Sequence, residues 1–140
     1  MTMSPAEELR AAAAHLRQTA AAAVTGDRTR WMVGATLRSK TPVVVDDRDR
    51  PTVLIEAFAR NYEQVGAWIA LACPALAEPF GELLGQIADG MDDHGAHERY
   101  AGTDLGGPDR RRVVADENGR VRHDWTAALD SARVILGTAR

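Results

Sequence analysis

The chain has 140 residues, with 17 basic and 20 acidic side chains and a formal net charge of −3 at pH 7. This balance gives no global basic field for holding nucleic acid or an anionic membrane, although a local basic patch is compatible with it. A single cysteine, Cys73, excludes an internal disulfide framework and any zinc site that needs two thiolates. The length fits one domain, residues 1–140, which needs no metal to fold. We expect no cofactor.

Residues 5–24 are predicted to form the first helix. Ser4 is a suitable N-cap, Pro5 suits the first helical position, and Glu7 completes a capping box. Alanine gives helix propensity but little area to bury, so this helix should need a close partner and is compatible with a homodimer. Its narrow apolar stripe consists of Leu9, Ala13, Leu16, Ala20 and Val24.

The segment AAAAHLRQTAAAAV within this helix is only weakly apolar and is interrupted by polar residues. It therefore resembles neither a signal peptide nor a membrane span. We expect a cytoplasmic protein that does not bind membranes.

Residues 29–58 differ in character, because TRWMVGATL, TPVVVDD and PTVLIEAF are rich in β-branched and aromatic residues. Turn-like segments separate them, so we predict an antiparallel meander of about three strands. Pro42 and Pro51 fit strand starts, where no backbone donor is required.

Asn61 is predicted to begin the next helix, with Gln64 completing an Asn variant of the capping box, and Pro74 to end it. A further helix should follow at once, with Pro79 in its first turn. The two would form a helical hairpin or a sharp bend. The residues expected to face the core are Val65, Trp68, Ile69 and Ala72 in the first and Phe80, Leu83, Leu84, Ile87 and Met91 in the second.

Residues 92–110 are rich in Gly, Asp and His and are predicted to form an irregular loop. Residues 111–123 could form a hairpin that turns at Asn118-Gly119. Asp124 is the expected cap of a last helix that Gly137 ends. The predicted fold class is α+β: a small antiparallel sheet of about three strands, with a possible extra hairpin near 111–123, packed against about four helices.

The segment MDDHGAHERY contains two of the four histidines. His94 and His97 would share a face if the segment were helical, and with His123 they could hold the metal of a metal-dependent hydrolase. A first histidine, His94 or His97, followed by the pair His123-Asp124 and by Asp130 resembles the ligand set of phosphohydrolases named for a His-Asp pair. Gly90 and Gly95 argue against a helix here, and a solvated helix end followed by a loop is the simpler interpretation.

Arg110, Arg111 and Arg112 form the densest basic cluster of the sequence. With Arg120 and Arg122 across a hairpin they could form a basic ribbon that binds nucleic acid, as an alternative function. An edge strand protected from aggregation by its charges is the simpler interpretation.

Trp31, Trp68 and Trp125 occur in three separate apolar segments. Large aromatic residues usually fill a core, so we expect all three to be buried together. Trp31 is alternatively a candidate for a surface that binds a partner.

The order of these segments resembles small proteins of prophages and integrative elements in high-GC bacteria. Such proteins show a Pro-Gly-Pro-Trp-like turn, an Ile-Ala-x-x-x-Pro segment and a terminal Ala-Arg-x-Ile-Leu-Gly. The corresponding segments here are Gly26–Trp31, Ile69–Pro74 and Ala132–Gly137, and the first lacks the proline turn. The resemblance implies no catalytic residue. We therefore expect a non-enzymatic accessory or regulatory protein of a phage or mobile element that binds an unknown protein partner.

Overall fold

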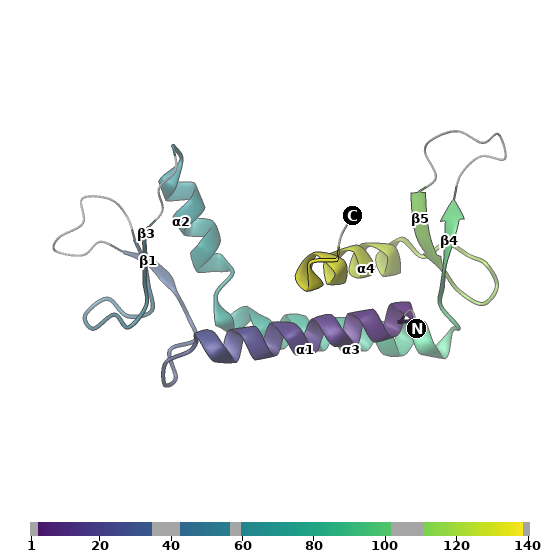
Figure 1. Ribbon diagram of the computed structural model, residues 1–140, viewed down its shortest axis with the longest axis horizontal. Coiled ribbons are helices and arrows are strands. Elements are labelled where there is room, and N and C mark those ends of the chain that lie inside the picture. The colour runs from purple at the N-terminus through teal and green to yellow at the C-terminus, as the bar shows by residue number, and fades with distance from the viewer. Residues whose placement is uncertain (1–2, 35–42, 57–59, 102–110, 139–140) are drawn as a thin grey trace. The chain divides into compact units, whose positions relative to one another are not determined.

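The computed structural model describes residues 3–34, 43–56, 60–101 and 111–138 (Figure 1). These residues form four α-helices, one short 3-10 helix and two small antiparallel sheets, which confirms the predicted α+β class. The chain divides into two compact units. The first comprises residues 1–17 and 79–140, and the second comprises residues 18–78. The prediction of a single domain stays a prediction.

The first unit contains most of α1 (Pro5–Ala23) and of α3 (Ala77–Asp93), together with β4 (His97–Ala101), β5 (Arg111–Ala115) and α4 (His123–Leu136). The capping box of α1 is present as predicted. The N–H of Ser4 donates to Oε2 of Glu7 at 2.7 Å, and the N–H of Glu7 donates to Oγ of Ser4 at 3.2 Å.

The first helix, α1, packs against α3 and α4, which supply the partners that its alanine-rich stripe was expected to need. A few larger side chains fill the space between these helices. Leu9, Leu84, Met91 and Leu129 are the largest fully buried side chains of this core. The other buried members of the core are Ala6, Ala12, Ala13, Ala88, Val114, Trp125, Ala128 and Ala132.

β4 and β5 pair antiparallel in a two-stranded ribbon, with Arg99 opposite Val113 and Tyr100 opposite Arg112. The prediction of an irregular loop over 92–110 is therefore wrong for 97–101 and also for 92–93, which end α3, while 102–110 lie outside the described residues. The predicted hairpin at 111–123 is present in shortened form. The N–H of Asp116 donates to the carbonyl of Arg120 at 3.0 Å, the N–H of Arg122 donates to the carbonyl of Val114 at 2.9 Å, and one bridge joins Ala115 and Val121. β5 takes β4 as its main partner because its buried half needs a full ladder of hydrogen bonds.

α4 begins at His123 with Arg122 as its N-cap, so the prediction that Asp124 caps this helix is wrong. Asp124 lies in the first turn and accepts two hydrogen bonds from Arg122 instead. Gly137 ends the helix with a φ of 68°, as predicted for a left-handed C-cap.

The second unit contains a meander of β1 (Met32–Gly34), β2 (Val43–Val45) and β3 (Leu54–Glu56), in the order β1-β2-β3. It also contains α2 (Tyr62–Leu71) and the 3-10 helix η1 (Pro74–Leu76). The predicted three-stranded meander is confirmed. The central strand, β2, is buried along its whole length, which its three valines favour.

α2 packs on this sheet through Gly66, where an added Cβ would lie 3.9 Å from Cγ2 of Val44. Asn61 occupies the N-cap position, but its side chain makes no capping hydrogen bond, so the predicted capping box is absent. Of the helices in the described ranges, none alone is both long and apolar enough to span a bilayer.

Candidate functional site

The three histidines proposed as metal ligands lie in three different settings. The ring of His94 stacks on Trp125, with 6.2 Å between the ring centroids. Nδ1 of His97 lies 3.3 Å from the carbonyl oxygen of Gly95, and His123 is the exposed first residue of α4. Within residues 3–34, 43–56, 60–101 and 111–138, no group of three or more His, Cys, Asp and Glu side chains could hold a metal ion. The structure therefore does not bring His94, His97 and His123 together as a ligand set.

The arginine cluster divides between the two faces of the β4–β5 ribbon. Arg111 and Arg112 are neighbours in β5, so their side chains point to opposite faces, and Arg110 lies outside the described residues. Nε of Arg112 donates to the hydroxyl of Tyr100 at 3.2 Å, and its guanidinium lies 5.5 Å from the centre of that ring. Arg122 covers the ring of Trp125 at 4.5 Å. Arg111 and Arg112 are exposed, as a binding role requires.

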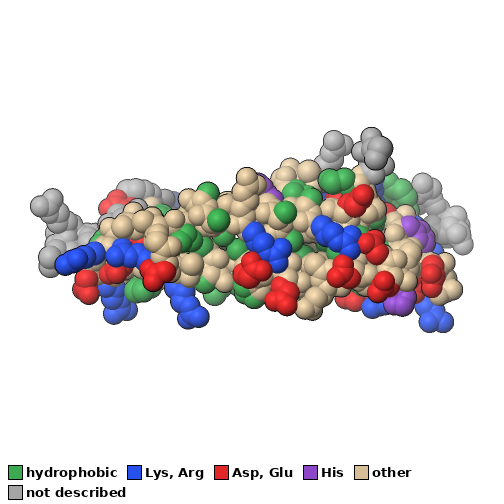
Figure 2. Space-filling model, turned by 90° about the horizontal axis from the view of Figure 1, so that it is seen from below, with side chains coloured by type: hydrophobic (Ala, Val, Ile, Leu, Met, Phe, Trp, Pro, Cys, Tyr) green, Lys and Arg blue, Asp and Glu red, His purple; other side chains and the backbone are tan. Residues whose placement is uncertain are grey.

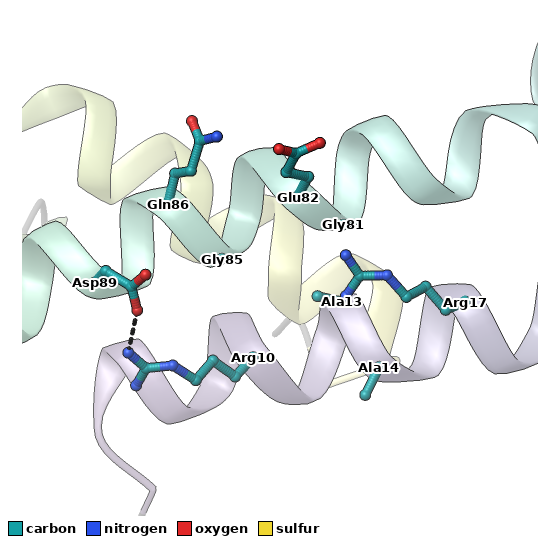
Figure 3. A pocket seen from close by; sticks show the side chains of 9 residues that line it. All are labelled: Arg10, Ala13, Ala14, Arg17, Gly81, Glu82, Gly85, Gln86 and Asp89. Atoms are coloured by element: carbon teal, nitrogen blue, oxygen red, sulfur yellow. Dashed lines mark hydrogen bonds and ion pairs between the residues drawn. The ribbon is translucent and has the colours of Figure 1, made fainter.

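An open groove of about 350 Å³ lies between α1 and α3 in the first unit (Figure 3). Arg10 lies at one end, where it donates at 2.7 Å to both Asp89 and Asp92. Arg17 lies towards the other end, with its guanidinium packed against Gly81. Basic and acidic side chains also stand next to each other on the face seen in Figure 2. The residues that line the groove include no serine, threonine, cysteine, histidine or tyrosine. Their carboxylates are Glu82 and Asp89, and Asp89 is bound by Arg10.

Asp46 is the buried acid of the second unit. One carboxylate oxygen accepts from the N–H groups of Thr52 and Val53 at 2.8 and 3.0 Å, and the other accepts from the hydroxyl of Thr52. Burial alone would raise the pKa of Asp46, but these hydrogen bonds outweigh it and hold the pKa well below its usual range. Arg28 lies 3.7 Å away. The hydrogen bonds of Asp46 close the turn between β2 and β3, which is a structural role.

The cysteine offers little as a nucleophile. Cys73 is a free, partly buried thiol at the N-cap of η1. Within the described part of the chain, its side chain makes no capping hydrogen bond. A thiol in such an apolar segment behaves as a small hydrophobic side chain.

The most unusual surface of the described residues is the outer face of α2. Trp68 is 69 % exposed and Leu71 is 65 % exposed, and Leu76 in η1 is also exposed. Residues 64–77 contain no charged side chain. We call Trp68, Leu71 and Leu76 the α2 apolar surface. The prediction that Trp68 faces a core is wrong, and the same correction applies to Ala72, which is exposed, and to Leu83, which is 48 % exposed.

The other two tryptophans differ. Trp125 is 4 % exposed and belongs to the core, as predicted. Trp31 is half-buried, and its indole N–H is buried with no hydrogen-bond partner in the described part of the chain. Trp31 therefore exposes less of its ring to a binding partner than Trp68 does.

The sequence contained one signal for the α2 apolar surface that the prediction missed. A helix that is apolar all round should be buried on every side, and Glu63 is the only charged residue of α2. A three-stranded sheet covers only one side of such a helix. Comparison of the chain with family models, curated proteins and solved structures finds no match.

Proposed function

We propose that the protein is a non-enzymatic accessory or regulatory protein that acts by binding another protein, with the α2 apolar surface at the centre of the interface. The observation that carries this proposal is the 69 % exposure of Trp68 on a helix whose opposite side packs on a sheet. The resemblance to small prophage and integrative-element proteins supplies the setting in which we expect such a role.

The geometry of α2 supports an interface rather than a core. Trp68 follows Gly66 by two positions, which places the two about 200° apart around the helix. Gly66 lies against Val44 of the sheet, so Trp68 points away from it. Leu71 follows Trp68 by three positions and lies on the same face. Exposed tryptophan and leucine at this spacing are the anchors of helices that bind in grooves.

The exposed area of the α2 apolar surface indicates how much of an interface it can form. Trp68 and Leu71 together expose about 300 Å² of apolar area, as judged from the areas that such side chains bury. A standard interface buries about 800 Å² on each partner, so this surface forms the apolar centre and not the whole contact. Because residues 64–77 carry no charge, the partner should present an apolar, uncharged groove.

Site-specific photo-crosslinking in the cell that encodes the protein tests this proposal. A photoreactive residue at position 68 or 71 should give a discrete adduct, whereas the same residue at position 63, an exposed site on the same helix, should not. The adduct from position 68 should disappear with Leu71→Glu. Equal labelling from positions 63 and 68 would contradict the proposal. An adduct with a second copy of the chain would show that the partner is the protein itself and that the interface forms a homodimer.

The partner identified in this way should then be tested with purified components. Trp68→Ala should weaken binding by about 30-fold, because truncation of a central tryptophan commonly costs about 2 kcal/mol or more. Glu63→Ala is the matched control and should change the affinity by less than about threefold.

A further inference from the structure

The β4–β5 ribbon has a distinct charge pattern that the proposed protein interface does not use. Residues 97–122 contain six arginines and five acids, so this segment is net positive in a chain of net charge −3, and the rest of the chain carries −4. The described residues of the ribbon and its following turn, 97–101 and 111–122, hold five arginines and three acids, a local excess of positive charge, whereas residues 46–96 carry a net charge of −7. A local excess of positive charge favours the approach of an anionic partner.

Two of the acids beside the ribbon are already engaged. Glu98 accepts two hydrogen bonds of 2.8 Å from Arg133, which neutralises its charge from the helical side. Asp116 accepts from the N–H groups of Asn118 and Arg120 at 2.9 Å. These contacts reduce the repulsion that an incoming phosphate would meet on the strands.

The basic side chains lie on both faces of the ribbon. Arg99 and Arg111 are on one face, because Arg99 is opposite Val113 and Arg111 is opposite Ala101, two positions further along. Diagonal neighbours of this kind lie about 7–8 Å apart. Arg112 is on the other face, where it contacts Tyr100. Figure 1 shows that this ribbon stands at one end of the helical layer of the first unit, clear of α1 and α3 along its upper part.

We propose that the β4–β5 ribbon binds duplex DNA, with Arg99, Arg111 and Arg112 holding phosphates on the walls of the major groove. A two-stranded β-ribbon fits this groove, which is about 12 Å wide. Cationic side chains on both faces match a groove that has a phosphate chain on each side. The ribbon would not enter the deep, narrow major groove of duplex RNA.

Fluorescence anisotropy with a labelled duplex of about 20 base pairs and arbitrary sequence tests this proposal. Binding should be measurable at about 50 mM salt and should weaken as salt rises, with a slope of log K against log salt near about −3, since three phosphates are neutralised. An RNA duplex of the same sequence should bind at least about tenfold more weakly.

Matched charge variants separate a ribbon site from a general charge effect. R99S/R111S should weaken DNA binding at least about tenfold and reduce the salt slope by about two. R48S/R50S removes the same charge from two exposed arginines of the second unit and should leave binding unchanged. Urea-unfolding midpoints that match the wild-type value would show that both variants fold.

Several outcomes would overturn the proposal. These are an equal loss in both variants, a binding constant that ignores salt, RNA binding as tight as DNA binding, or no binding at about 50 mM salt. Tighter binding of single-stranded DNA that is lost with Tyr100→Ala would assign the ribbon to base stacking instead. Tighter binding of a polyglutamate peptide would assign it to an acidic protein.

Discussion

Arg133 of α4 binds Glu8 of α1 through two hydrogen bonds of 2.9 Å, although 125 positions separate them in the chain. The same guanidinium donates two further bonds of 2.8 Å to Glu98 of β4. These bonds from Arg133 hold the pKa of Glu98 below its ordinary value. One planar guanidinium thus joins two helices and a strand, which is a task suited to its fixed fork of donors.

Removing this guanidinium should destabilise the first unit. We expect Arg133→Met to lower the free energy of unfolding by about 2–3 kcal/mol, because two partly buried carboxylates lose their counter-ion. Arg133→Lys should keep part of the stability, since an ammonium group cannot bridge both carboxylates in the same geometry. Urea unfolding at pH 7 measures both changes.

The control for this prediction is Arg10→Met. Arg10 binds Asp89 and Asp92, but its side chain is 43 % exposed, so its loss should have a smaller effect than that of Arg133. The triple variant R133M/E8Q/E98Q should regain stability relative to R133M. An unfolding free energy of R133M equal to that of the wild type would contradict the structural role.

The depressed pKa of Asp46 predicts acid sensitivity in the second unit. A carboxyl group whose folded pKa lies below its unfolded value stabilises the protein above the unfolded pKa, near about 4, and loses this effect as pH falls. We therefore expect stability to drop progressively below about pH 5. Thermal unfolding between pH 7 and pH 3 measures this dependence.

Asp46→Asn is the variant that isolates this contribution. An amide keeps the shape of the carboxylate but replaces one acceptor oxygen with a donor, so it cannot satisfy the three donors of Thr52 and Val53 together. The variant should be less stable at pH 7 and should show a flatter pH profile than the wild type. Parallel pH profiles for the two proteins would show that another carboxyl group causes the acid sensitivity.

The tryptophans offer a direct contrast between core and surface. Trp125→Ala should cost about 3–5 kcal/mol, because it leaves a cavity in the core of the first unit. Trp68→Ala should change stability by no more than about 0.5 kcal/mol, because the ring is exposed. Iodide should quench the fluorescence of Trp68 in the purified protein, and Trp68→Phe should remove most of the quenched emission. Strong protection of Trp68 from iodide would show that its surface is already covered.

Gly81 and Gly85 of α3 both line the groove between α1 and α3, so the same substitution can be compared at the two positions. A Cβ at position 85 meets nothing within 4 Å, so Gly85→Ala should stabilise the helix by about 0.5–1 kcal/mol. A Cβ at position 81 would lie 3.0 Å from Cζ of Arg17, so Gly81→Ala must displace that guanidinium and should gain less. Thermal unfolding of both variants measures the difference, and equal gains would show that Arg17 moves aside without cost.

Local sequence signals predicted the elements of this protein well. The capping box at Ser4, the glycine that ends α4 and the valine-rich meander all depend on chemistry within a few residues. The signals at Asn61 and Asp124 failed because an N-cap side chain also needs the right backbone position. At Asp124, Arg122 offers a stronger, charge-assisted partner.

The sequence by itself determined the α+β class, the helices, the three-stranded meander and the apolar character of α2, because periodicity and capping are local properties. Only the tertiary structure decided that β4 pairs with β5, that Arg133 joins Glu8 and Glu98, and that Trp68 is exposed while Trp125 is buried. An apolar helix shows which residues could be buried, but the number of partners packed around it decides which of them are. Those partners come from distant parts of the chain, which is why the apolar pattern of α2 indicated an uncovered face without showing which of its residues are exposed.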